Sequence, residues 1–130
     1  MGESRRPRVL VVEDEPDFAN QLTRILQKNF SADVTIAPNI KSARERIKDA
    51  EFEIITLDYQ LPDGDGLSMI AEIMDGLDDP PPVIVVTGHG DEQTAAAAFR
   101  LGAAGYVVKD ERLPGMLAEA VKNALAGIGL

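Results

Sequence analysis

Residues 54–66 read IITLDYQLPDGDG, and this stretch decides the fold class. Its first four residues are apolar or β-branched, which predicts a buried strand, and the proline, glycine and aspartate residues that follow are typical of a turn. From Leu67 onward the apolar residues recur at helical spacing. A short apolar strand followed by an amphipathic helix is the repeating unit of a parallel α/β sheet.

The same unit occurs five times along the chain. The predicted strands are short runs of apolar and β-branched residues, at 9–12, 33–37, 54–57, 83–86 and 105–108. After the first strand, apolar residues fall at i, i+4, i+7 and i+8 counted from Phe18, which predicts one buried face of a helix. Asp91 and Gly102 are predicted as the N-cap and C-cap of an alanine-rich helix.

The composition bounds the size of the molecule and its classes of partner. The chain has 130 residues, 45% of them hydrophobic, which is enough for one domain with its own core. We expect this domain at 8–126, between a flexible tail at 1–7 and a C-terminal end at 127–130. Lys and Arg number 13 against 22 Asp and Glu, and the net charge of -9 argues against nucleic acid or an anionic membrane as a partner.

Two absences from the sequence exclude further classes. No cysteine is present, which rules out a disulfide framework, a thiolate zinc site and a cysteine nucleophile. No apolar run approaches the roughly 20 residues of a membrane-spanning helix. We therefore expect a cytoplasmic domain.

Polar residues follow four of the five predicted strands. Glu13 and Asp14 follow the first strand, Asp58 the third, Thr87 the fourth and Lys109 the fifth. Ligands of an open parallel sheet bind outside the carboxyl ends of its strands, so we expect these side chains to converge at one edge.

The chemistry of this set favours a divalent cation and a phosphoryl group. Residues 12–16 lack the glycine-rich fingerprint that binds nucleotide phosphates. Clustered carboxylates suit Mg²⁺, which shares its remaining positions with water and phosphate. Lys109 and the Thr87 hydroxyl can then donate to the phosphoryl oxygens during an in-line transfer, with Asp58 as the nucleophile.

Four motifs at these strand ends carry a family resemblance. They are VVEDEP at 11–16, LDYQLPDGDG at 57–66, VTG at 86–88 and GYVVK at 105–109. In this order and placement the chain resembles the receiver domains of two-component response regulators. The resemblance implies a flavodoxin-like, doubly wound (βα)5 fold with a five-stranded parallel sheet in the order 2-1-3-4-5.

The resemblance also implies the roles of the site residues. Asp58 would accept a phosphoryl group from a phosphohistidine on a sensor histidine kinase or a histidine phosphotransfer protein. Asp14, Asp58 and the backbone carbonyl of Gln60 would bind Mg²⁺, or Mn²⁺ in its place, with Glu13 acting through a water. Such a domain catalyses only its own phosphorylation and dephosphorylation and turns over no diffusible substrate.

A switch is implied as well. Thr87 and Tyr106 occupy the positions of the family's switch pair, in which the hydroxyl moves to the phosphoryl oxygen and the aromatic ring turns inward. The face formed by residues 95–101, Tyr106 and residues 113–126 would report this change to an output domain, a downstream protein or a second copy in a phosphorylation-dependent homodimer. Gln60 and His89 stand at positions that tune the lifetime of the phosphoryl group.

The sequence departs from the commonest family pattern at two positions. Glu13 stands where aspartate is more frequent, which keeps a carboxylate but lengthens the side chain. Asp110 stands where many members have a proline in a cis peptide bond, so the geometry of the bond between Lys109 and Asp110 is left open.

Alternative interpretations exist for the same residues. A haloacid-dehalogenase-type phosphatase also has a nucleophilic aspartate after a parallel strand, but it needs an acid where Gln60 stands. A receiver-like interaction module that has lost phosphorylation is a third class, and failure to bind Mg²⁺ would favour it. Asp14 taken alone is also a plausible N-cap of the first helix, and Asp63 and Asp65 are better explained by turn chemistry than by a calcium loop.

Overall fold

The computed structural model describes residues 6–88 and 90–129 and contains a five-stranded parallel sheet. Its strands are β1 (Arg8–Val12), β2 (Asp33–Ala37), β3 (Ile54–Leu57), β6 (Val83–Thr87) and β7 (Gly105–Val108). The strands lie in the order β2-β1-β3-β6-β7, so the predicted order 2-1-3-4-5 is confirmed.

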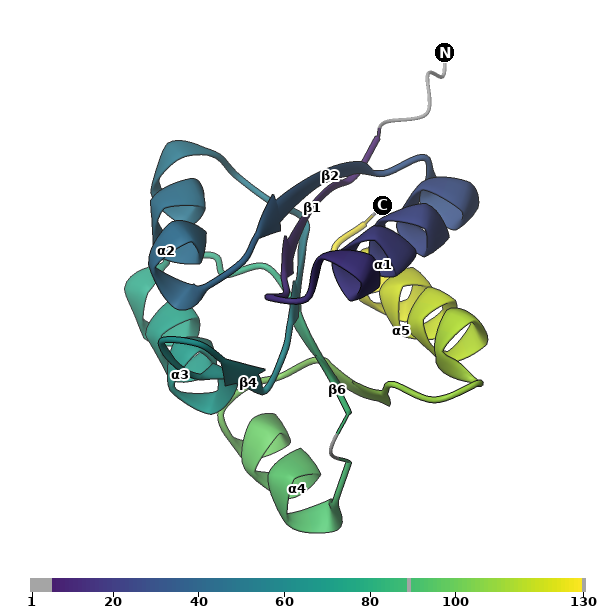
Figure 1. Ribbon diagram of the computed structural model, residues 1–130. Helices are drawn as coiled ribbons and strands as arrows, with labels where there is room; N and C mark the ends of the chain where they lie inside the picture. Colours follow the sequence, from purple (N-terminus) through teal and green to yellow (C-terminus); the bar gives the residue numbers. More distant parts are fainter. Residues whose placement is uncertain (1–5, 89, 130) are drawn as a thin grey trace.

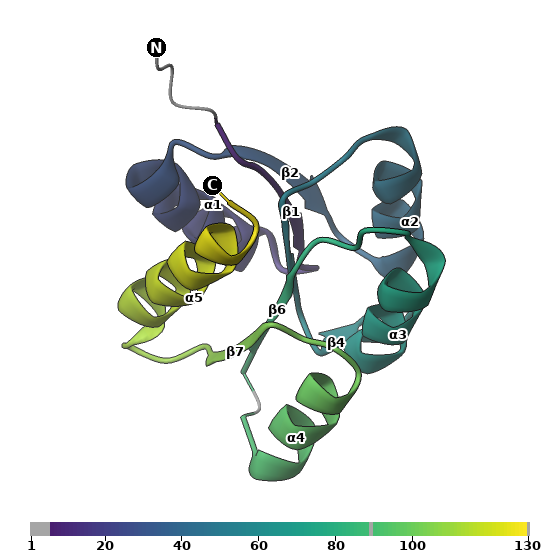
Figure 2. The ribbon, with the colours of Figure 1, turned by 180° about the vertical axis from the view of Figure 1, so that it is seen from behind.

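In the described part of the chain, five helices cover the two faces of the sheet. They are α1 (Pro16–Phe30), α2 (Ile40–Asp49), α3 (Gly66–Gly76), α4 (Glu92–Arg100) and α5 (Leu113–Gly127). Helices α1 and α5 lie on one face, and α2, α3 and α4 lie on the other (Figures 1 and 2). The last helix includes Gly127, the first residue of the expected C-terminal end. Within the described part of the chain, no helix is both long and apolar enough to cross a membrane.

The buried residues form one core on each face of the sheet. Every residue of β3 and β6 is buried, which is typical of central strands in a parallel sheet covered on both sides. Because successive strand residues point to opposite faces, Val9 and Val11 pack with α1 and α5, whereas Leu10 and Val12 pack with α2 and α3.

A two-stranded hairpin between β3 and α3 is absent from the sequence prediction, which places only a turn there. It pairs β4 (Gln60–Leu61) with β5 (Gly64–Asp65). At its tip, the Asp63 carboxylate accepts hydrogen bonds from the backbone N–H groups of Ile40 (2.8 Å) and Lys41 (3.0 Å) at the start of α2. Asp65 caps α3 by accepting from the Ser68 N–H group at 2.8 Å. Each carboxylate therefore accepts from backbone N–H groups at the start of a helix, Asp63 at α2 and Asp65 at α3.

The predicted N-cap of α4 is confirmed, and the predicted C-cap is wrong by one residue. Asp91 is the N-cap and accepts from the Thr94 N–H group at 2.6 Å. The helix ends at Arg100 with Leu101 as its C-cap, and Gly102 follows with φ of 112°. Glycine adopts this backbone conformation more readily than other residues, which explains how the chain turns from α4 toward β7.

We predict that Thr56→Val stabilises the protein. The Thr56 side chain is buried between Val11 and Ile84 on the neighbouring strands, and its hydroxyl has no hydrogen-bond partner among the described residues. Removing an unsatisfied buried hydroxyl at constant shape should raise the free energy of unfolding by about 1 kcal/mol. Denaturant unfolding at 25 °C measures this change.

The partly exposed Thr35 on β2 provides the control for this prediction. Thr35→Val should leave the free energy of unfolding nearly unchanged, because solvent reaches that position. A Thr56→Val variant less stable than the unchanged chain would contradict the prediction.

We predict that Asp63→Asn lowers the melting temperature in a pH-dependent way. The backbone hydrogen bond from Ile40 is the main cause that lowers the pKa of the Asp63 carboxyl, with that from Lys41 adding to it. A lowered pKa stabilises the fold above the carboxyl's unfolded pKa, and this contribution disappears as the pH falls through the folded pKa. The difference between the variant and the unchanged chain should therefore be largest near pH 7 and shrink below about pH 4.

Thermal unfolding followed by circular dichroism between pH 7 and pH 3 tests this, with Asp49→Asn at the opposite end of α2 as the control. Asp49 lies where the helix dipole disfavours a negative charge, so its removal should be neutral or slightly stabilising at pH 7. A pH-independent loss in Asp63→Asn would show that the carboxylate charge is not responsible.

Candidate functional site

Backbone hydrogen bonds extend the sheet into the predicted site residues. The Glu13 N–H group donates to the Ala37 carbonyl at 3.0 Å, and the Asp58 N–H group donates to the Val12 carbonyl at 3.1 Å. The Lys109 N–H group donates to the Thr87 carbonyl at 2.8 Å. These bonds hold the backbones of Glu13, Asp58 and Lys109 to neighbouring strands. The sheet therefore fixes the positions of their Cα atoms.

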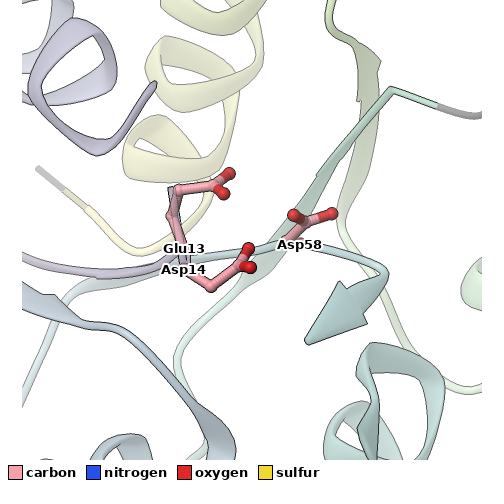
Figure 3. Close-up of side chains that lie close together, drawn as sticks. All are labelled: Glu13, Asp14 and Asp58. Atoms are coloured by element: carbon pink, nitrogen blue, oxygen red, sulfur yellow. The ribbon is translucent and has the colours of Figure 1, made fainter. Parts of the chain in front are cut away.

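Three carboxylates meet at this edge. Oxygen atoms of Glu13, Asp14 and Asp58 all lie within 4.8 Å of one another. The three side chains point into the same space beside the ends of β1 and β3 (Figure 3). Glu13 and Asp58 are buried, whereas Asp14 is exposed at the mouth of the cluster.

Lys109 joins two of these carboxylates. Its Nζ atom lies 2.8 Å from Glu13 Oε1 and 3.1 Å from Asp58 Oδ2. Burial by itself lowers the pKa of Lys109, but the hydrogen bond to Glu13 and the charges of Asp58 and Glu13 outweigh it, so the pKa of Lys109 is raised. The lysine is therefore a firmly charged ammonium group inside the acidic cluster.

The longer side chain of Glu13 is accommodated by two contacts. Besides the ion pair with Lys109, its Oε2 atom accepts a hydrogen bond from the Glu15 N–H group at 3.1 Å. Burial raises the pKa of Glu13 above its ordinary value, although Lys109 and the Glu15 N–H group act in the opposite direction. Glu13 therefore provides a buried carboxyl group at the site, in contact with Lys109.

The donor set fits a hard divalent cation. Three carboxylates face a single ammonium group, so an excess of negative charge stays uncompensated by the described side chains around it. Mg²⁺ is bound in proteins through one or two carboxylates and keeps several waters, which agrees with an exposed Asp14 beside a buried Asp58.

A protein-family model described as the response regulator receiver domain matches residues 9–122. The chain belongs to this family. It is 35% identical over 120 residues to the response regulator protein PilR of Pseudomonas aeruginosa, covering 92% of this chain and 26% of PilR. It is 33% identical over 103 residues to the transcriptional regulatory protein LytR of Staphylococcus aureus, covering 78% of this chain and 41% of LytR. The chain therefore spans between about a quarter and two fifths of these relatives' lengths.

Solved structures agree with this assignment. The signal receiver domain of a response regulator NarL from Mycobacterium tuberculosis has a TM-score of 0.86 at 28% identity, over 95% of this chain and 99% of that one. A two-component response regulator from Clostridium difficile also has a TM-score of 0.86, at 22% identity, over 96% of this chain and 100% of that one. The second similarity concerns the fold alone. Together they support the flavodoxin-like receiver fold.

The structure also places three of the four other residues to which the family resemblance assigns roles. The Gln60 N–H group is 3.4 Å from Asp58 Oδ1, and Thr87 is the buried last residue of β6. Tyr106 is half-buried on β7, where burial raises the pKa of its phenol and a backbone hydrogen bond at Asp91 opposes that shift. The phenol therefore lies against the N-terminus of α4. The lifetime-tuning position at His89 falls outside the described residues.

Two interpretations from the sequence can now be decided. Asp14 is not the cap of α1, because Glu15 is the N-cap residue there and makes no side-chain cap hydrogen bond. The peptide bond between Lys109 and Asp110 is trans. The Asp110 carboxylate accepts from the Arg112 backbone at 2.9 Å and from its guanidinium at 3.0 Å, which fixes the turn after Lys109.

Two further contacts at the site were not predicted from the sequence. The ring of Phe18, assigned from the sequence to the apolar face of α1, lies 4.3 Å from Lys109 Nζ. Gly66 begins α3 directly against the Asp58 backbone, where a Cβ atom would meet the Asp58 carbonyl group, and its N–H group donates to the Tyr59 carbonyl at 2.6 Å. The glycine-rich turn is the only local signal for the second contact, and no local signal exists for the first.

We predict that Gly66→Ala destabilises the protein. A Cβ atom at this position would lie 2.4 Å from the Asp58 carbonyl oxygen, so the backbone of the site would have to shift. Overpacking of this kind should lower the free energy of unfolding by about 1–3 kcal/mol. Gly76→Ala at the other end of α3 is the control, because a Cβ atom there meets nothing within 4 Å and should be neutral or stabilising by up to about 1 kcal/mol. Denaturant unfolding that ranks the two variants equally would contradict the prediction.

Proposed function

We propose that this receiver domain is an active phosphoacceptor, in which Asp58 receives a phosphoryl group in a metal-dependent reaction. The observation that carries the proposal is the contact of one ammonium group, Lys109, with both Asp58 and Glu13 inside a cluster of three carboxylates. This arrangement combines a nucleophile, cation ligands and a charge-stabilising donor at one edge of the sheet.

The acidic cluster would hold the cation. Asp14, Asp58 and the backbone carbonyl of Gln60 are the proposed direct ligands of Mg²⁺, and Glu13 acts through water; Mn²⁺ takes the same kind of ligand. When bound, the cation supplies positive charge to the phosphoryl oxygens. Glu13 already contacts Lys109 and the Glu15 N–H group, which supports its indirect role in cation binding.

The transfer itself uses side chains of the chain. An Asp58 carboxylate oxygen forms a bond to phosphorus as the bond from phosphorus to the imidazole nitrogen of a phosphohistidine breaks. The imidazole leaves with the electron pair of that bond and is protonated from solvent. Lys109 and the Thr87 hydroxyl donate hydrogen bonds to the phosphoryl oxygens, where negative charge is concentrated.

Phosphorylation would then change a distant surface. The Thr87 hydroxyl moves to the phosphoryl oxygen and the Tyr106 ring turns inward, away from Asp91 at the start of α4. The phosphoryl group stabilises this arrangement over the resting one and shifts the population toward it. Phe99 on α4 and Met116 on α5 are 52% and 49% exposed, which supports these helices as part of a partner-binding face. Gln60 and His89 would tune how long the phosphoryl group persists.

The chemistry of the transfer defines the proposed partners. The phosphoryl donor is a phosphohistidine of a sensor histidine kinase or a histidine phosphotransfer protein, in the cytoplasm. The recipient of the signal is an output domain, a downstream protein or a second copy of the chain. In this scheme the domain acts on its own phosphoryl group and on no diffusible substrate, which distinguishes it from a phosphatase.

We predict that incubation with Mg²⁺ and acetyl phosphate adds one labile phosphoryl group to the chain, measured by intact mass. Asp58→Asn should remove the addition because the nucleophilic carboxylate is lost. Asp65→Asn is the control from the same loop, since asparagine also caps helices well and the acceptor is untouched. Chelation of Mg²⁺ by EDTA should abolish labelling. A gain that persists in Asp58→Asn, or an unchanged chain that neither gains mass nor binds Mg²⁺, would overturn the proposal.

A further inference from the structure

The Lys109 ammonium group has three N–H donors, and among the described residues carboxylates face two of them. One direction faces Glu13 Oε1 at 2.8 Å and another faces Asp58 Oδ2 at 3.1 Å. The ring of Phe18 lies 4.3 Å from the same nitrogen, measured to its centroid. The lysine side chain is only 15% exposed, so little of the ammonium group is left to water.

We propose that Phe18 is a positioning residue that holds the Lys109 ammonium group in place for phosphoryl transfer to Asp58. The inference rests on the proposed function, since it assigns a role within that reaction. The 4.3 Å distance is well inside the roughly 6 Å range over which an aromatic face attracts a cation. The attraction is stronger where water is excluded, as it is around this lysine.

An aromatic face suits this lysine better than a third carboxylate would. During transfer, Lys109 must shift a hydrogen bond from Asp58 to an arriving phosphoryl oxygen. A ring attracts the ammonium charge without binding any one N–H group, so the nitrogen can turn while it keeps its place. A third carboxylate would compete for the hydrogen bond that the phosphoryl group needs.

The position of Phe18 in the fold supports this role. It lies in the first turn of α1, four residues after Asp14, so the same segment carries the predicted metal ligands and the ring. The side chain is half-buried and its other contacts are with the core between the sheet and α1 and α5. The core therefore fixes the ring, and the ring limits where the ammonium group can lie.

Phe30 provides a matched control. It lies at the other end of α1, is also half-buried and packs against the same core. Phe18→Leu and Phe30→Leu thus remove the same atoms from one helix and one core, but only Phe18→Leu removes the ring beside Lys109. Phe18→Tyr keeps an aromatic face and serves as the conservative variant.

The experiment measures initial rates of Mg²⁺-dependent labelling by acetyl phosphate, using intact mass at several donor concentrations. Phe18→Leu should lower the maximal rate about three- to thirty-fold, the range expected from losing a desolvated cation–π contact, and leave the half-saturating concentration unchanged. Phe18→Tyr should restore most of the rate, and Phe30→Leu should label like the unchanged chain. Equal rates in Phe18→Leu and Phe30→Leu would overturn the inference.

A second readout does not depend on labelling. The ring face should shift the NMR signals of the Lys109 ε-methylene protons upfield, and this shift should disappear in Phe18→Leu but remain in Phe30→Leu. An unchanged Lys109 signal in Phe18→Leu would overturn the inference while leaving the proposed function intact. Absence of both labelling and Mg²⁺ binding in the unchanged chain would overturn the proposed function, and the inference with it, whatever the NMR spectra show.

Discussion

The rest of the structure depends on holding three like charges together at one edge of a sheet. The carboxylates of Glu13, Asp14 and Asp58 repel one another, and each would gain by moving apart into water. Lys109 offsets part of this repulsion through its two ion pairs. The remainder must be opposed by the fold, in which hydrogen bonds to neighbouring strands hold the backbones of Glu13 and Asp58.

The parallel sheet meets this demand through its packing. Both faces of its central strands are covered, so the ends of β1, β3 and β6 have little freedom to separate. The helices that begin at the site add to the constraint. Gly66 brings the start of α3 against the Asp58 backbone, and Asp63 ties the same loop to the start of α2. The loop that follows Asp58 is thus held in place by its contacts with the starts of α2 and α3.

Strand β7 connects this site to the surface of the domain. Tyr106 lies within the strand and contacts the N-terminal region of α4, and Lys109 follows directly after the strand ends. The turn after Lys109 is fixed by Asp110 and Arg112, just before α5. Lys109 therefore lies four residues before α5 and three residues after Tyr106, which contacts the start of α4. This proximity is the physical route by which the proposed chemistry at Asp58 would reach the proposed partner-binding face.

The sequence alone determined the five strands, their helices and the residues that follow the strand ends, because side-chain periodicity and turn residues are local signals. Strand order came from the family motifs. Only the tertiary structure decided which atoms meet: the two partners of Lys109, the ring of Phe18 above it, and the contact of Asp63 with Ile40, 23 residues earlier. The hairpin of β4 and β5 has two residues per strand, too few for a periodic pattern. Such contacts depend on how helices pack against a twisted sheet, which no local stretch of sequence encodes.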